Sequence, residues 1–236
     1  MKEEARRRKA DLFEHLKVSI LTQQLLPGSD LDEAELSAAF GLSRTPLREV
    51  FREMSGAGYL ELRANKGARV SDLSYRTLRD FFLAAPMIYG AILRLAALNA
   101  SNSQLNELKE AQQKFKAALR IGSAGDRALA NNHFHEVTGD MAGNIFLQPS
   151  FQRLLIDHAR IGTTFYQPQN TEMVSNLAKA SDQHDQIISA IETRNEQLAG
   201  TLADEHWNLS RGQIEVFVMP EALEVPLGTL SKSTSA

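Results

Sequence analysis

The segment from Gly41 to Met54 constrains the fold of this chain more than any other, because it reads as a tight turn followed by a short amphipathic helix. Gly41 suits the turn, and the Ser43 side chain can accept hydrogen bonds from the free N–H groups of the helix. Pro46 falls in the first helical turn, where its missing N–H costs no hydrogen bond. The sequence therefore predicts a helix that begins near Arg44.

This helix has two different faces. Its apolar residues recur at three- and four-residue spacing, which predicts one buried stripe made of Leu47, Val50, Phe51 and Met54. Arg44, Arg48 and Arg52 recur every fourth residue and share a neighbouring face. We expect that basic face to be open to a negatively charged partner.

Two further helices are predicted before the turn, and a hairpin after the basic helix. Apolar spacing indicates helices over residues 11–26 and from about Asp32 onwards. Gly56 and Gly58 should break the basic helix, and two short strands are then expected, at residues 59–62 and 68–70. Together these elements predict a winged helix-turn-helix domain, whose third helix enters the DNA major groove beside the wing.

The remainder of the chain reads as helical. Helical spacing continues through residues 75–100, 104–121, 127–141, 146–166, 172–192 and 196–218. We therefore expect a mainly α protein with a DNA-binding domain at residues 1–73 and an all-α bundle of six or seven helices at residues 74–222. Residues 223–236 are expected to form a disordered tail.

The composition excludes several classes of protein. The chain has no cysteine, which rules out disulfides and thiolate metal sites and fits a reducing compartment. No uninterrupted apolar run is long enough to cross a bilayer, and no signal-peptide core follows the basic N-terminus. We expect a soluble cytoplasmic protein without a membrane partner. The formal net charge is −3, but the deficit lies after residue 73, and the bases before it are clustered.

Four polar residues occupy positions on the buried faces of predicted helices. His184 and His206 each fill a place in an otherwise apolar stripe, and Asn131 and His135 run along the edge of a third stripe at i, i+4. A single buried histidine is usually a core residue bonded to a backbone carbonyl. Four such groups need a shared explanation, because each unpartnered buried polar group costs roughly 1–3 kcal/mol. A divalent metal ion supplies one, with zinc expected first and nickel or manganese as alternatives.

Residues 25–70 resemble the DNA-binding domain of the GntR family of bacterial regulators. The matching motifs, in the family's order and spacing, are residues 27–31, 33–36, 41–49 and 65–70. The resemblance implies DNA contacts by Arg44, Arg48, Asn65, Lys66 and Gly67, and we expect Thr45 and Arg69 to contact DNA as well. Ala34 stands where some members have an arginine, so the operator sequence of relatives does not transfer.

The helical part resembles the FCD domain of the FadR-like branch of the same family. The matching residues are Asn131 to His135, Gly143 and Asn144, His184 with Ile187, Ile188 and Ala190, and His206. Members often have an aspartate in place of Asn131, and many carry an arginine and a glutamate where we align Ala85 and Tyr89. These differences bear on the identity of the effector. Pro86 suggests a local kink in that helix.

The function predicted from these features is that of a homodimeric transcriptional regulator. In the family that it resembles, repression is commoner than activation. Its binding to an inverted-repeat DNA operator would be controlled by a small organic acid. Because the four predicted ligands are neutral, the metal ion would keep its full charge and attract a carboxylate. We expect leucine, isoleucine and alanine side chains around the ion to hold the carbon skeleton of the acid.

Two alternatives stay open. The metal ion could itself be the signal, or the protein could be a metal-dependent hydrolase, since three histidines and an open coordination position can activate water. However, no carboxylate follows these histidines in an H-E-x-x-H pattern, and Glu136 should point away from the ion. We therefore expect no enzymatic activity. His158 has no spacing that argues for a role at the metal, and His133 should point elsewhere.

Overall fold

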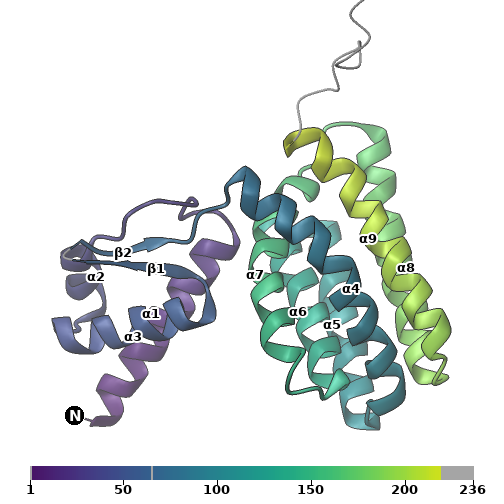
Figure 1. The fold of residues 1–236 in the computed structure, drawn as a ribbon, viewed down its shortest axis with the longest axis horizontal. Coiled ribbons are helices and arrows are strands. Elements are labelled where there is room, and N and C mark those ends of the chain that lie inside the picture. The colour runs from purple at the N-terminus through teal and green to yellow at the C-terminus, as the bar shows by residue number, and fades with distance from the viewer. Residues whose placement is uncertain (1, 65, 219–236) are drawn as a thin grey trace, which may run out of the picture.

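A computed structural model describes residues 2–64 and 66–218 of the chain. A small domain with a hairpin lies beside a larger helical bundle, and the segment between β2 and α4 joins them (Figure 1). The predicted wing residue Asn65 and the predicted tail at 223–236 lie outside the described residues. The mainly α fold with a winged helix-turn-helix is as the sequence predicts.

The N-terminal domain consists of three helices and a two-stranded sheet. Its elements are α1 (Lys2–Leu21), α2 (Glu33–Phe40), α3 (Arg44–Ala57), β1 (Leu60–Arg63) and β2 (Gly67–Val70). The strands pair antiparallel, with Leu60 opposite Val70 and Arg63 opposite Gly67. The predicted stripe of α3 is buried and packs against apolar residues of α1 and both strands.

Helix α1 differs from the prediction at both ends. It begins at Lys2 instead of residue 11, although its first turns carry almost no apolar side chains. Ion pairs hold this polar part: Arg8 lies 2.6 Å from Glu4, and Lys9 lies 2.9 Å from Glu49 on α3. The helix ends at Leu21 instead of residue 26, because Gln23 adopts a positive φ of 57° and turns the chain.

The ends of α2 and α3 show which of the predicted capping residues and helix-ending glycines act as expected. Asp32 caps α2, since its Oδ1 accepts hydrogen bonds from the N–H groups of the next turn. Helix α3 begins at Arg44 as predicted, but the Ser43 side chain makes no capping hydrogen bond there. Gly56 lies inside α3, and the helix ends only at Gly58, which adopts a left-handed φ of 95°.

The C-terminal domain is a helical bundle. The described residues hold six helices here: α4 (Tyr75–Asn99), α5 (Asn102–Ile121), α6 (Ala124–Ala142), α7 (Gln148–Phe165), α8 (Thr171–Glu192) and α9 (Glu196–Val218). Ser101 and Ser123 begin α5 and α6 with capping boxes. Helix α4 continues on both sides of Pro86, so the kink suggested by the sequence does not interrupt it. By length and composition alone α4 could span a membrane, but it is a helix of this bundle and buries one face in it.

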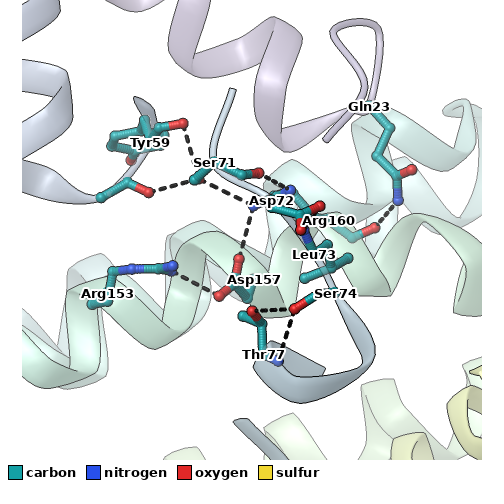
Figure 2. Close-up of polar contacts among 11 residues, drawn as sticks. Gln23, Tyr59, Ser71, Asp72, Leu73, Ser74, Thr77, Arg153, Asp157 and Arg160 are labelled. Atoms are coloured by element: carbon teal, nitrogen blue, oxygen red, sulfur yellow. Dashed lines mark hydrogen bonds and ion pairs between the residues drawn. The ribbon is translucent and has the colours of Figure 1, made fainter. Parts of the chain in front are cut away.

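Helix α7 forms the junction with the N-terminal domain (Figure 2). The guanidinium of Arg160, which is fully buried, donates to the backbone carbonyl of Ser71 at 2.7 Å and to Asp157 at 2.9 Å. Arg153 donates to the other oxygen of Asp157 at 2.7 Å. From the end of α1, the Gln23 amide donates to the Thr163 hydroxyl at 2.9 Å. The segment between β2 and α4 is therefore fixed to α7 by charge-assisted hydrogen bonds.

Candidate DNA-binding surface and metal centre

The exposed face of α3 carries the basic residues predicted to contact DNA. Arg44, Thr45, Arg48 and Arg52 are all exposed, while the opposite face of the helix is buried. The Arg48 guanidinium pairs with Glu33 of α2, whose Oε2 lies 3.2 Å from the Arg48 Nη2. The Arg48 side chain nevertheless stays 57% exposed.

The wing lies next to this face. A hollow of about 220 Å³ between α3 and the hairpin is lined by Arg48, Arg52, Arg63 and Gly67 among others, and Lys66 is exposed at the wing tip. Arg69 is ion-paired as Arg48 is, but more closely: its Nε lies 2.8 Å from Glu61 on the neighbouring strand, and its side chain is 32% exposed against 57% for Arg48. The structure thus brings Arg48 and Gly67 to one hollow, and Arg69 is the less accessible of the two arginines.

Three of the four predicted metal ligands form one cluster in the bundle. The candidate ligand atoms of His135 on α6, His184 on α8 and His206 on α9 all lie within 4.8 Å of one another. Asn131 lies one turn before His135 and lines a small cavity together with His206. His135 and His184 are 1% and 0% exposed, whereas His206 is half-buried, so the cluster lies inside the bundle with one member nearer its surface.

Hydrogen bonds around the cluster fix the orientation of two imidazoles. The Nδ1 of His184 lies 3.0 Å from the Oε1 of Gln112, and the Nδ1 of His206 lies 3.0 Å from the Oε1 of Gln183. Since an amide oxygen only accepts, each Nδ1 carries the proton and each Nε2 keeps its lone pair. Gln112 is itself fixed, because its Nε2 donates to the Ser181 carbonyl at 2.9 Å. Such outer contacts are typical of histidines that hold a metal ion.

Several buried atoms of the cluster lack hydrogen-bond partners within the part of the chain that the structure describes. They are both ring nitrogens of His135, the Nε2 of His184 and the Oδ1 of Asn131. Leaving a buried polar atom unsatisfied costs about 1–3 kcal/mol. A divalent cation would satisfy one ring nitrogen of His135, the Nε2 of His184 and the Oδ1 of Asn131 together, so the residues present fit a metal ion.

The histidines of the cluster are held in their neutral form. Burial lowers the pKa of His206 to about 4 and that of His158 to about 3, with the neighbouring His206 adding to the effect at His158. Burial also lowers the pKa of His135 and His184 well below the usual value, and the surrounding histidines contribute. Neutral imidazole is the form that binds metal ions.

His158 is part of this site although its spacing gave no argument for it. Its ring centroid lies 5.1 Å from that of His135, and its Nδ1 lies 2.5 Å from the Tyr89 hydroxyl of α4. Leu155 and Ile161, three residues before and after His158, are buried on the same face of α7 and could have indicated its position.

The predicted lining of leucine, isoleucine and alanine is incomplete: Ala180 and Leu209 line the cavity beside the cluster, but so do aromatic side chains. Aromatic rings surround the cluster: Phe134 stacks on His184 at a centroid distance of 3.7 Å, Phe115 lies 4.9 Å from His184, and Tyr89 lies 5.4 Å from His135. The cavity between Asn131, His158 and His206 has a volume of only about 10 Å³. That is room for about one water molecule, so a larger ligand requires side chains to move.

Glu136 and His133 point away from the cluster, as the sequence predicts. Glu136 contacts Lys17 of α1 at 3.4 Å and His133 at 3.7 Å, on the side of α6 that faces the N-terminal domain. Glu136 is therefore not placed to act as a general base for a metal-bound water molecule at the cluster.

Comparisons with known proteins agree with this architecture. The sequence profile of the bacterial regulatory proteins of the gntR family matches residues 8–70, and that of the FCD domain matches residues 86–209. A relative from Paenarthrobacter nicotinovorans, named "Probable D-xylose utilization operon transcriptional repressor", is 31% identical over 193 residues, which cover 79% of this chain and 80% of that protein. The HTH-type transcriptional repressor RspR of Escherichia coli K12 is 24% identical over 186 residues, or 78% of each chain.

Solved structures share the fold. McbR/YncC of E. coli matches with a TM-score of 0.73 at 17% identity, over 88% of this chain and 96% of that chain. A GntR transcriptional regulator from Rhodococcus sp. RHA1 matches with a TM-score of 0.69 at 16% identity, over 88% of this chain and 97% of that one. The two-domain arrangement is therefore one that solved proteins adopt.

Proposed function

We propose that this chain is a repressor controlled by a small carboxylate. The chain belongs to the GntR family of bacterial regulators, and it is a transcriptional regulator of the FadR-like branch with an FCD domain. The carboxylate would bind at a divalent metal ion held by Asn131, His135, His184 and His206. The observation that carries this proposal is the convergence of buried, unpartnered ligand atoms in the C-terminal domain. The family membership also makes the protein a regulator and not an enzyme.

Operator DNA would be read by α3 and the wing. Arg44 and Arg48 are exposed on the helix that enters the major groove, where arginine pairs with guanine edges. Lys66, which is exposed at the wing tip, would neutralise a phosphate. Thr45 and Gly67 border the same surface, and Arg69 would contribute least, because it is less exposed than Arg48 and lies closer to its carboxylate partner.

A carboxylate is the ligand that the charges of the site favour. The four proposed ligands are uncharged, so a divalent ion among them would keep a formal charge of two in an enclosed site. When bound, the ion would offer a positive centre to the oxygens of an acid, and zinc is the ion we expect first. The surrounding aromatic rings would hold the carbon skeleton of the acid. In the runner-up proposal the metal ion itself is the signal.

The effect of the ligand would pass through α7. His158 lies at the cavity where the acid would bind, and Arg160 on the same helix holds the Ser71 carbonyl between the domains. Since the cavity is nearly closed, admitting an acid would move the side chains around it and bias the packing of α7. The position of the N-terminal domain would change with it.

We infer a homodimer in the cytoplasm that binds an inverted-repeat operator, because one recognition helix reads only a few base pairs. Helix α4 offers a surface for the second copy. Leu83 and Met87 lie one turn apart on it and are 64% and 73% exposed. A side chain at Gly90, on the next turn, would meet nothing within 4 Å among the described residues, so a partner helix could approach closely.

Operator binding tests the proposal. A bound sequence would be selected from random DNA, and its affinity measured by fluorescence anisotropy with metal-loaded and chelated protein, each with and without small carboxylates. The proposal expects a carboxylate to release the operator only from metal-loaded protein. Release by metal alone would favour the runner-up, and release by a carboxylate from fully chelated protein would refute control through the metal site.

A further inference from the structure

We propose that the protein has a second ligand site, for a small organic ammonium ion, in a cavity between the N-terminal domain and the bundle. The cavity has a volume of about 320 Å³ and is lined by Lys17 of α1 and Tyr59 on one side and by α6 and α7 on the other. This is the lower end of the range typical of ligand pockets. It is separate from the histidine cluster.

One wall of the cavity is a row of oxygen acceptors on α6. Asn132, Glu136 and Asp140 recur every fourth residue, so they lie one above another on the face of the helix toward the N-terminal domain. The proposed metal ligands Asn131 and His135 each lie one residue earlier and point to the interior of the bundle. Helix α6 thus serves two sites with two different faces.

Asn132 supplies an acceptor that no described residue satisfies. The side chain is 5% exposed, and its Nδ2 donates to the Oε1 of Glu136 at 2.9 Å. This hydrogen bond fixes the orientation of the amide, and the Oδ1 is then left buried without a partner in the described chain. Because an unsatisfied buried acceptor is costly, the wall favours a ligand that donates hydrogen bonds.

The charges around the cavity favour a cation. Glu136 is shared by Lys17 at 3.4 Å and by His133 at 3.7 Å. Asp140 accepts a hydrogen bond from the Gln148 amide at 2.7 Å, but it forms no ion pair with any described residue. Burial raises the pKa of the Asp140 carboxyl, and the negative charges of Glu107 and Glu136 add to the effect. A ligand with a positive charge would offset this excess of carboxylate.

The remaining walls suit the body of such a ligand. Phe13, Phe151, Leu155 and Ile156 are apolar, and the rings of Phe13 and Tyr59 pack edge to face at 6.3 Å. Aromatic faces attract cations as well as hydrocarbon. Burial raises the pKa of the Tyr59 hydroxyl, which keeps it neutral. A primary ammonium group fits this chemistry, because its N–H groups can donate to neighbouring acceptors of the α6 row while a short carbon chain lies against the rings.

A bound ammonium ion would contact both domains. The acceptor row belongs to the bundle, whereas Phe13 and Lys17 belong to the N-terminal domain. The ligand would therefore stabilise the docked arrangement, as any ligand stabilises the state that binds it. Its effect on operator binding would be separate from that of a carboxylate at the histidine cluster.

Calorimetry on the full-length protein tests this site, with n-butylammonium, putrescine and ethanolamine as probes and butanol and butyrate as uncharged and anionic counterparts. We expect at least one ammonium probe to bind at millimolar concentration with and without chelator, while butanol and butyrate give no heat with chelated protein. Asp140→Asn, at an exposed residue, and Glu136→Gln should each weaken binding about fivefold or more. Asp185→Asn removes an exposed carboxylate elsewhere on the bundle, paired with Lys116, and should leave the affinity unchanged.

Three results would overturn the proposal. They are no heat from any ammonium probe, equal binding by wild type and both cavity variants, and loss of binding on chelation of metal, which would place the ligand at the histidine cluster. Because chelation abolishes only the proposed carboxylate response, failure of that response and failure of the ammonium site are distinguishable.

Discussion

His158 and Arg160 lie on the same short stretch of α7 and contact different parts of the protein. The His158 Nδ1 lies 2.5 Å from the Tyr89 hydroxyl beside the histidine cluster, whereas the Arg160 Nη2 lies 2.7 Å from the carbonyl of Ser71 between the domains. Figure 2 shows the second of these contacts, with Asp157 and Arg153 completing the network. One rigid helix therefore joins the proposed ligand site to the DNA-binding domain.

The first prediction concerns this junction. Arg160→Met removes the donor to the Ser71 carbonyl and one of the two cationic partners of Asp157. Because both charges of the Arg160–Asp157 pair are buried, the free energy of unfolding should fall by about 3–5 kcal/mol. Thermal or denaturant unfolding measures this change. Operator binding at low temperature should persist, with a weaker response to carboxylate.

Arg153→Met is the matched control for that experiment. Arg153 also pairs with Asp157, but its side chain is 39% exposed, so its loss should cost only about 0–1 kcal/mol. Equal stabilities of the two variants would show that the buried contact to Ser71 does not fix the domains.

The second prediction concerns the orientation of His184. Gln112→Leu removes the acceptor that holds the His184 Nδ1 proton. The affinity for zinc should fall by roughly 10- to 100-fold, because the Nε2 lone pair is no longer directed at the cluster. Competition with a chromophoric chelator measures this affinity. Gln113→Leu, at the exposed neighbouring position, should leave it unchanged, and an unchanged affinity in both variants would refute the role of Gln112.

The third prediction separates base contacts from phosphate contacts. Arg48→Ala should weaken binding to the selected operator by about 1–3 kcal/mol and relax its specificity. Lys66→Ala should lower affinity for all DNA sequences and reduce the slope of log K against log salt by about 1. Arg69→Ala should change less than Lys66→Ala, since Glu61 pairs with Arg69. Gel-shift titrations over a salt series measure these affinities. Unchanged operator affinity of Arg48→Ala would contradict the predicted base contact.

The fourth prediction concerns assembly. Met87→Glu places a charge on the apolar, exposed face of α4 and should convert the proposed dimer to a monomer at micromolar concentration, as judged by sedimentation. Ile121→Glu changes a residue that is 91% exposed at the end of α5 and should stay dimeric. A Met87→Glu dimer as tight as wild type would place the interface elsewhere.

Much of the fold could be predicted because apolar spacing and turn residues act locally. The stripe of Leu47, Val50, Phe51 and Met54 is buried as its spacing indicates. The first turns of α1 could not be predicted in this way, since ion pairs such as Lys9 with Glu49 join residues far apart in the sequence. The sequence also suggested a cap at Ser43 that α3 does not use.

The candidate site could be predicted only in part. Asn131, His135 and His184 are buried, because each occupies or borders an apolar stripe of its own helix. The role of His158 depends on Tyr89, which comes from another helix, and no single-helix pattern shows such a pairing. The burial of Arg160 is the feature that the sequence indicates least. A fully buried arginine needs a partner, and here that partner is a backbone carbonyl of the segment between the domains, which the sequence of α7 does not reveal.

The fifth prediction addresses the charge of the metal site. Asn131→Asp places a negative charge beside the proposed ion, which should tighten metal retention and weaken the binding of a carboxylate. The variant is nearly isosteric, so the fold should be unchanged. Dialysis against chelator followed by elemental analysis measures the first effect.

The central claim is that a carboxylate binds at a metal ion in the histidine cluster, and calorimetric titration of a small carboxylate tests it most directly. The titration uses metal-loaded wild type, chelated wild type and metal-loaded Asn131→Asp. We expect binding to metal-loaded wild type, loss of binding on chelation and weaker binding by the aspartate variant. A carboxylate that binds chelated protein equally well, or binds Asn131→Asp as tightly as wild type, would contradict the claim.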